Sequence, residues 1–194
     1  MVSMDIFSTI FIAAAAFAAC NIGDMFILLS FFINPRFSTR EIVVGQYLSV
    51  SALIVICLVL GLSAAAISPI FLHALGILPI FIGIKNLLQA RTLLRSEIEE
   101  EKRIVRKMGF NSLSVAAVTF ADGSDNLGVF TPLFAHSNAG EISFMIIVFM
   151  VLVGLWCWGA HYLVHHPKLG KHIRSYGSVV APLALIVIGL FILL

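Results

Sequence analysis

The sequence predicts an all-α integral membrane protein with six transmembrane helices, arranged as two inverted three-helix repeats with both termini outside. Three observations predict this fold. First, 60% of the 194 residues are hydrophobic and only 11% are charged, a composition too apolar for the surface of a soluble domain. Second, the apolar residues gather in segments of about 20 residues, the length that crosses a bilayer as a helix. Third, all Lys and Arg residues lie in alternate loops.

The chain is expected to form one domain, 1–194, with a hydrophilic connector at about 89–111 between two apolar halves. Helices 1–3 occupy about 5–88 and helices 4–6 occupy about 112–194. The expected helical segments are 5–33, 41–67, 69–88, 112–134, 142–163 and 177–194.

Polar and helix-breaking residues mark the helix ends. Asn34-Pro35 ends the first helix, and Ser38 with Glu41 forms the pattern of a capping box that begins the second. Asn111 can cap the fourth helix. Gly23 permits a local break within the first helix, and the charged run 97–107 predicts a short, solvated surface helix in the connector.

The basic residues predict the orientation in the membrane. Arg36 and Arg40 belong to the first loop, the basic residues from Lys85 to Lys107 to the third, and those at 168–174 to the fifth. Because cytoplasmic loops carry the excess of Lys and Arg, these three loops are expected in the cytoplasm and both termini outside.

The two halves match at a separation of 100 to 103 residues. The matched pairs are Ser38 and Asn138, Glu41 and Glu141, Asp24 and Asp125, and Pro79 and Pro182. Since each half has an odd number of helices, the second half must enter the membrane upside down. Inverted repeats with polar interruptions in corresponding helices are typical of transporters whose site lies near the midplane.

Three carboxylates lie where a membrane helix should be apolar, namely Asp24, Asp122 and Asp125. A charged carboxylate there costs roughly 2.5–3.5 kcal/mol on insertion scales, and no Lys or Arg lies in the middle of any segment to neutralise it. Asn21 and Asn126 add oxygen ligands. Asn21 and Asp24 are three residues apart, as are Asp122 and Asp125, and residues at this spacing share a helix face. We therefore predict a site for a hard cation. Further candidate ligands or path residues are Cys20, Ser124, Thr119, Gln46 and Tyr47.

Simpler interpretations remain open for several of these residues. The aspartates can be protonated and hydrogen-bonded to asparagines, Cys20 can be a small packing residue, and Tyr47 can anchor the membrane interface. No disulfides are expected, because the cysteines show no CxxC spacing and lie in apolar segments. The histidines between His161 and His172 form a second candidate metal cluster or ordinary interface polarity.

Four motifs resemble the cadmium resistance transporter family, within the lysine-exporter superfamily of six-helix permeases. They are Asn21-Ile-Gly-Asp-Met-Phe-Ile-Leu28, Gly45-Gln-Tyr-Leu48, Gly76-Ile-Leu-Pro-Ile-Phe-Ile-Gly83 and Asp125-Asn-Leu-Gly-Val-Phe-Thr-Pro-Leu-Phe134. In the family pattern the first helix carries Asn-x-Asp-Asp and the fourth Asn-Gly-Gly-Asp. Here Gly23 replaces an aspartate and Asp122 replaces an asparagine, so one carboxylate is lost in one half and one is gained in the other.

The resemblance implies export of divalent metal cations, cadmium or a similar ion, by a multi-pass protein of the cell membrane. Proton antiport is the expected coupling, because clustered carboxylates hold protons that a divalent cation would displace. The expected partners are the metal ion, protons and the lipid bilayer. No cofactor, no nucleic acid and no enzymatic activity are expected. Small residues such as Gly61, Gly154 and Gly159 permit close helix packing, either within the chain or in a homo-oligomer.

Two other functions compete with metal export. One is export of amino acids or another small cation within the same superfamily. Three acidic residues, with no buried basic residue to hold a substrate carboxylate, argue against it. The other is an intramembrane aspartyl protease with Asp24 and Asp125 as the catalytic pair. There Asn21 replaces the first glycine of the protease motif, Ala181-Pro-Leu183 does not match its Pro-Ala-Leu motif, and six helices are too few.

Overall fold

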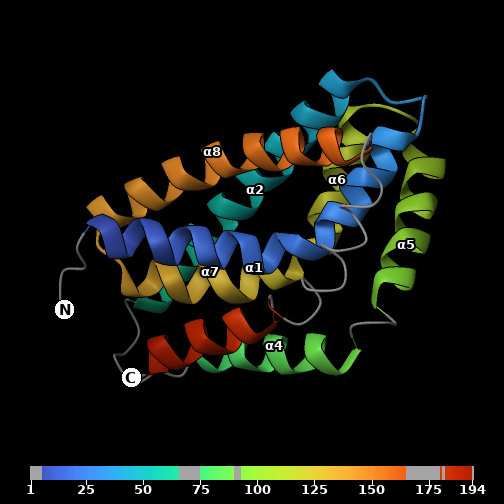
Figure 1. Cartoon of the computed structure of the whole chain (residues 1–194). Helices are drawn as coiled ribbons and strands as arrows, with labels where there is room; N and C mark the ends of the chain where they lie inside the picture. Colours follow the sequence, from blue (N-terminus) through green and yellow to red (C-terminus); the bar gives the residue numbers. More distant parts are fainter. Residues whose placement is uncertain (1–5, 66–74, 90–92, 165–179, 181, 194) are drawn as a thin grey trace.

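The computed structural model describes residues 6–65, 75–89, 93–164, 180 and 182–193, and every element in these ranges is an α-helix. The all-α prediction is therefore confirmed for the described residues (Figure 1). The helices are α1 (Ile6–Ile33), α2 (Thr39–Ala65), α4 (Ile77–Gln89), α5 (Leu93–Met108), α6 (Ser112–Asp122), α7 (Ser124–His136) and α8 (Ala139–Val164), followed by a terminal helix, Pro182–Leu193.

The predicted caps set the helix starts. At α2, the backbone N–H of Ser38 donates to Glu41 Oε2 at 2.8 Å, and the N–H of Glu41 donates to Ser38 Oγ at 3.2 Å. At α8, Asn138 and Glu141 make the same reciprocal pair at 2.8 and 3.0 Å. Each pair satisfies backbone donors that the first turn of a helix leaves free. The matched motifs therefore cap a helix in the same way in both halves.

Asn111 also caps its helix as predicted. Its side chain accepts from the N–H of Ser114 at 2.9 Å, and the Ser114 hydroxyl accepts from the N–H of Asn111 at 3.2 Å. The preceding helix, α5, ends at Met108 and is followed by Gly109, whose φ of +81° is a conformation that favours glycine. The connector is thus a helix that stops sharply before α6 begins.

Two helices of the bundle are interrupted at a glycine. α1 bends by 60° between Ile6–Ile22 and Asp24–Ile33, which Figure 1 shows as a change of direction along the blue helix. The prediction of one continuous fourth helix over 112–134 is wrong, because α6 ends at Asp122 and α7 begins at Ser124. Gly123 lies between them with φ −68° and ψ 17°. The two interruptions, at Gly23 and Gly123, leave short helical pieces that end close to the predicted aspartates.

The core forms where helices of one half pack on helices of the other. α1 packs on α8, and α2 packs on α6 and α7. Phe17, Phe130 and Phe149 are almost fully buried. Their rings lie together, with centroids 5.9 Å apart for Phe17 and Phe149 and 4.4 Å apart for Phe130 and Phe149. Aromatic pairs in this range add attraction beyond the area they bury.

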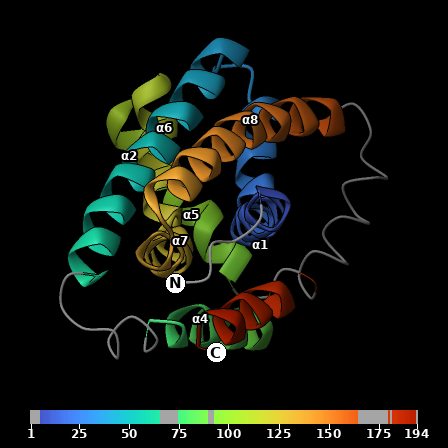
Figure 2. The same ribbon diagram turned by 90° about the vertical axis from the view of Figure 1, so that its left-hand side faces the viewer.

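α4 and the terminal helix lie side by side along one flank of the bundle, as Figures 1 and 2 both show. Glycines allow this close approach. A Cβ at Gly76 would lie 2.8 Å from the Gly189 carbonyl, and one at Gly83 would lie 2.6 Å from the Pro182 carbonyl. Such backbone contacts leave no room for a larger residue.

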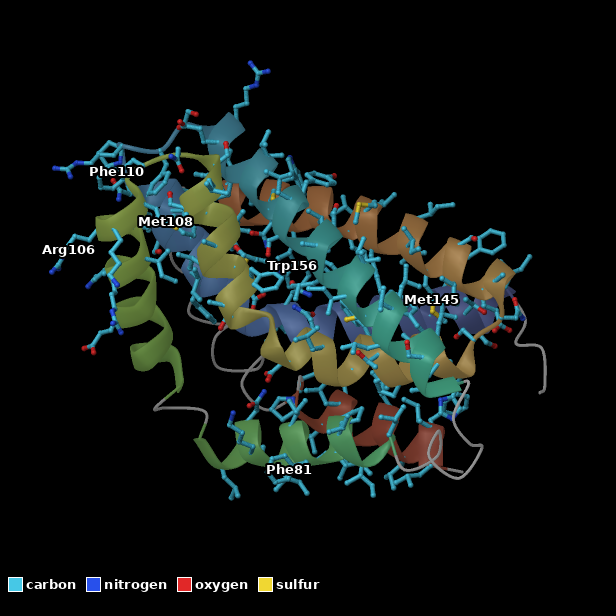
Figure 3. The ribbon with its side chains drawn as sticks, turned by 180° about the vertical axis from the view of Figure 1, so that it is seen from behind. Phe81, Arg106, Met108, Phe110, Met145 and Trp156 are labelled. Carbon is cyan, nitrogen blue, oxygen red and sulfur yellow. The ribbon has the colours of Figure 1, made fainter. Side chains whose placement is uncertain are left out.

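The described basic residues gather at one end of the molecule. This end holds the start of α2, the end of α4 and all of α5, and Figure 3 shows Arg106 there, opposite Met145. The start of α1 and the end of the terminal helix lie at the other end (Figure 1). The third predicted basic loop, at 168–174, and His165, His166 and His172 lie outside the described residues. The arrangement of charge is thus polarised along the long axis.

The number of membrane spans remains a prediction. Within the described residues, Thr39–Ala64 and Ala139–Val164 are each long and apolar enough to cross a membrane, and the bent α1 pair would make a third span. α4 has 13 residues, about 20 Å of helix, which is shorter than the roughly 30 Å hydrocarbon core. The predicted third helix began at 69, and residues 66–74 lie outside the described part of the chain.

The outer surface of the bundle is apolar. Large aliphatic side chains are exposed along α2 and α8, among them Val55, Val59, Ile147 and Val151. A continuous apolar surface of this kind marks contact with lipid or another protein rather than water. The composition and the exposed surface therefore agree on a membrane protein.

Candidate functional site

The interruption of α1 meets the first turn of α7 inside the bundle. Nδ2 of Asn21 donates to Oδ1 of Asn126 at 3.4 Å and to the Phe17 carbonyl at 2.9 Å. Both asparagines are buried, with 1% and 2% of their surface exposed. The structure therefore brings together the two asparagines that the sequence singled out, one from each half.

Asn21 has a free acceptor at this meeting point. Its Oδ1 atom is buried and has no hydrogen-bond partner. A buried oxygen without a donor is costly, by about 1–3 kcal/mol, and such atoms call for an explanation such as an ion or water. An amide oxygen in this state suits a cation ligand.

The two predicted aspartates both lie near Cys20. Asp24 follows the bend of α1 and is 7% exposed, whereas Asp125 is half-buried in the first turn of α7. Both carboxylates are close enough to act electrostatically on the Cys20 thiol. That the two carboxylates form one site remains a prediction.

α4 supplies two neighbours of Asp125 that sequence reasoning missed. Nδ2 of Asn86 donates to Oδ2 of Asp125 at 2.6 Å, and Lys85 is close enough to act electrostatically on the same carboxylate. Lys85 is thus a nearby basic residue that the sequence analysis did not place beside Asp125. Lys85 was counted only among the loop charges and Asn86 was not considered, because only the packing of α4 on α7 shows their place.

Trp156 is another residue that the sequence analysis did not place near the candidate site. Its indole Nε1 donates to the Asn21 carbonyl at 2.9 Å, next to the bend of α1. Its ring also meets Phe17 edge to face, with centroids 5.8 Å apart. The indole therefore ties α8 to α1 beside the bend. A tryptophan in mid-helix gives no sequence signal of such a contact.

Two thiols lie against the first turn of α7. Sγ of Cys20 lies 3.9 Å from the Asp125 carbonyl, and Sγ of Cys57 lies 3.9 Å from the Asn126 carbonyl. All three cysteines are free and buried, as expected. The two thiols thus bring α1 and α2 into contact with adjacent carbonyl groups in the first turn of α7.

The remaining candidate residues make other contacts. Thr119 donates to Oε1 of Gln46 at 2.9 Å, which ties α6 to α2. The Tyr47 hydroxyl donates to the Met150 carbonyl at 3.0 Å, which ties α2 to α8. Asp122 is half-buried at the end of α6, and the Ser124 side chain lies outside the description. No three His, Cys, Asp or Glu side chains in the described residues are gathered closely enough to hold a metal ion.

One comparison with known proteins finds a match. The family described as "Cadmium resistance transporter" matches the chain over residues 17–194. No curated protein and no solved structure matches. The matched range includes both interruptions, the asparagine pair and α4.

Proposed function

Because this chain belongs to the cadmium resistance transporter family, we propose that it exports cadmium or a similar divalent cation across the cell membrane in exchange for protons. The family makes the protein a membrane transporter with a metal ion as its substrate. To this the proposal adds the direction of transport, the coupling ion and the residues of the cation site. Asp24, Asp125, Asn21 and Asn126 form the cation site, and Asp122 is a third, partly redundant carboxylate.

The observation that carries the proposal is the buried contact between Asn21 and Asn126 at 3.4 Å, beside the two aspartates. Interrupted helices expose carbonyls and carboxamides at membrane depth only where these line a polar site. The free Oδ1 of Asn21 supplies a ligand oxygen there. A hard or borderline divalent cation takes carboxylate and carbonyl oxygens of this kind.

Proton exchange follows from charge balance. Two carboxylates in a low-dielectric region favour being neutral, because burial and their mutual repulsion both disfavour the charged forms. Either two protons or one divalent cation neutralises the pair. Binding the cation therefore releases protons, and release of the cation at the outer face lets protons return.

An inverted repeat of six spans, with both termini outside, completes the proposal. It is supported by the equivalent caps of α2 and α8 and by the interruptions at Gly23 and Gly123. The packing of α1 on α8 and of α2 on α6 and α7 also agrees with an inverted repeat. In such a repeat α1 corresponds to α6 with α7, and α2 corresponds to α8, so the two contacts are equivalent. Alternating access in such folds moves one repeat against the other around a fixed site.

The test measures metal efflux from cells that carry Asp24→Asn or Asp125→Asn. Each change keeps the size and hydrogen bonding of the side chain but removes one charge of the pair. We expect each to abolish efflux of Cd²⁺ while the protein still inserts, and the double variant to be no worse than either single one, because groups that act as a unit are not additive.

Proteoliposomes with an imposed proton gradient test the coupling. Export should stop when a protonophore collapses the gradient. Full efflux by both single variants would remove these aspartates from the transport step, and efflux of lysine in place of metal would favour the amino-acid exporter instead.

A further inference from the structure

The Asp125 carboxylate is held from outside the two interrupted helices. The amide of Asn86 on α4 donates to its Oδ2 atom at 2.6 Å. Neither helix of the proposed cation site contributes this donor. α4 thus takes part in the site without being one of its interrupted helices.

A second contact fixes the register of α4 on α7. A Cβ added at Gly128 would lie 2.2 Å from Cδ1 of Ile82, so the glycine leaves room for that side chain. Ile82 lies one turn before Asn86, and Gly128 lies one turn after Asp125. The two helices therefore run antiparallel here, and the Ile82 contact sets Asn86 opposite Asp125.

The chemistry of an amide suits a positioning role. The NH₂ group of Asn86 can only donate, so it satisfies one carboxylate oxygen and leaves the other, Oδ1, for a cation. A lysine in its place would neutralise the carboxylate and compete with the cation. Hydrogen bonds to metal-ligating carboxylates hold their orientation, and loss of such a partner typically lowers metal affinity 10–100-fold.

We propose that Asn86 is a positioning residue for metal binding, which orients the Asp125 carboxylate so that one oxygen faces the cation. This inference rests on the proposed function of the Asp24–Asp125 site. It adds α4 to the elements that determine the affinity for the metal.

Cd²⁺ transport by the purified full-length chain in proteoliposomes tests the proposal. Asn86→Leu keeps the approximate size but removes the donor. We expect it to raise the KM for Cd²⁺ by about 10–100-fold with little change in Vmax. Asn86→Gln keeps the donor and should restore most of the affinity. Leu87→Ala is the matched control on the same helix, because Leu87 is 41% exposed, and it should leave KM unchanged.

A purely space-filling role predicts a different pattern. Because Gln is larger than Asn, Asn86→Gln would then raise the KM for Cd²⁺ at least as much as Asn86→Leu. Cd²⁺ binding to the purified Asp125→Asn variant distinguishes the positioning role from the space-filling role. If Asn86 acts through Asp125, adding Asn86→Leu to this variant should not change the affinity for Cd²⁺ further.

An unchanged KM in Asn86→Leu, or equal effects of Leu and Gln, would overturn the role of Asn86 while leaving metal export intact. Absence of Cd²⁺ transport by the wild-type chain is a different result, which would overturn the proposed function itself.

Discussion

The two aspartates of the proposed site have different surroundings, although they occupy matched positions in the sequence. Asp24 is almost fully buried beside the bend of α1. Asp125 is half-buried, accepts a hydrogen bond from Asn86 and lies within electrostatic reach of Lys85. The pair is therefore chemically asymmetric. Asp125 is the carboxylate that the predicted cytoplasmic end of α4 can influence directly.

The indole of Trp156 should stabilise the bent conformation of α1. Trp156→Phe keeps an aromatic ring against Phe17 but removes the donor to the Asn21 carbonyl. We expect a loss of about 1–3 kcal/mol, because a buried carbonyl is left without its partner. Thermal unfolding of the purified protein in detergent measures this. Trp158→Phe is the control, since Trp158 is 67% exposed, and it should leave the unfolding temperature nearly unchanged.

At the scale of helices, local signals were enough to predict where most elements begin. Ser38, Asn111 and Asn138 cap the helices that their neighbours in sequence suggested, because a cap depends on residues three apart. The interruption at Gly123 was missed, although Asp122-Gly-Ser is as polar as the stretch around Gly23. Asn86 and Trp156 were missed for another reason. Their partners lie 39 and 135 residues away, and only packing between helices determines such contacts.

The contact of α2 with α6 depends on Gly45. A Cβ there would lie 2.6 Å from both the Ser112 carbonyl and Val115 Cβ, so Gly45→Ala must push the helices apart. We expect it to destabilise the protein by about 1–3 kcal/mol, the usual cost of overpacking.

Gly159→Ala on α8 is the matched control. Nothing lies within 4 Å of its added Cβ, and alanine favours a helix over glycine by up to about 1 kcal/mol. Unfolding temperatures of the two variants should therefore move in opposite directions. Equal destabilisation would show that Gly159 also faces a neighbour, such as a second copy of the chain.

At the scale of the whole molecule, the charge distribution predicts the orientation. The described Lys and Arg residues lie at one end, and the first and last described helices have their free ends at the other (Figures 1 and 3). Tags fused at Met1 and Leu194 should therefore be reached by membrane-impermeant reagents on intact cells. A cysteine introduced at Arg103 on α5 should be labelled only after permeabilisation. The reverse pattern would invert the topology and the direction of export.

The aromatic cluster has a consequence for the resting cell. Phe17 and Phe130 lie one turn beyond Asn21 and Asn126, toward the end where the first and last helices have their free ends. Both rings pack on Phe149, and all three are at most 1% exposed. For the proposed transporter, we expect these buried rings to block an ion that reaches the asparagines from the basic end. The protein would then not leak ions down the membrane potential while it is idle.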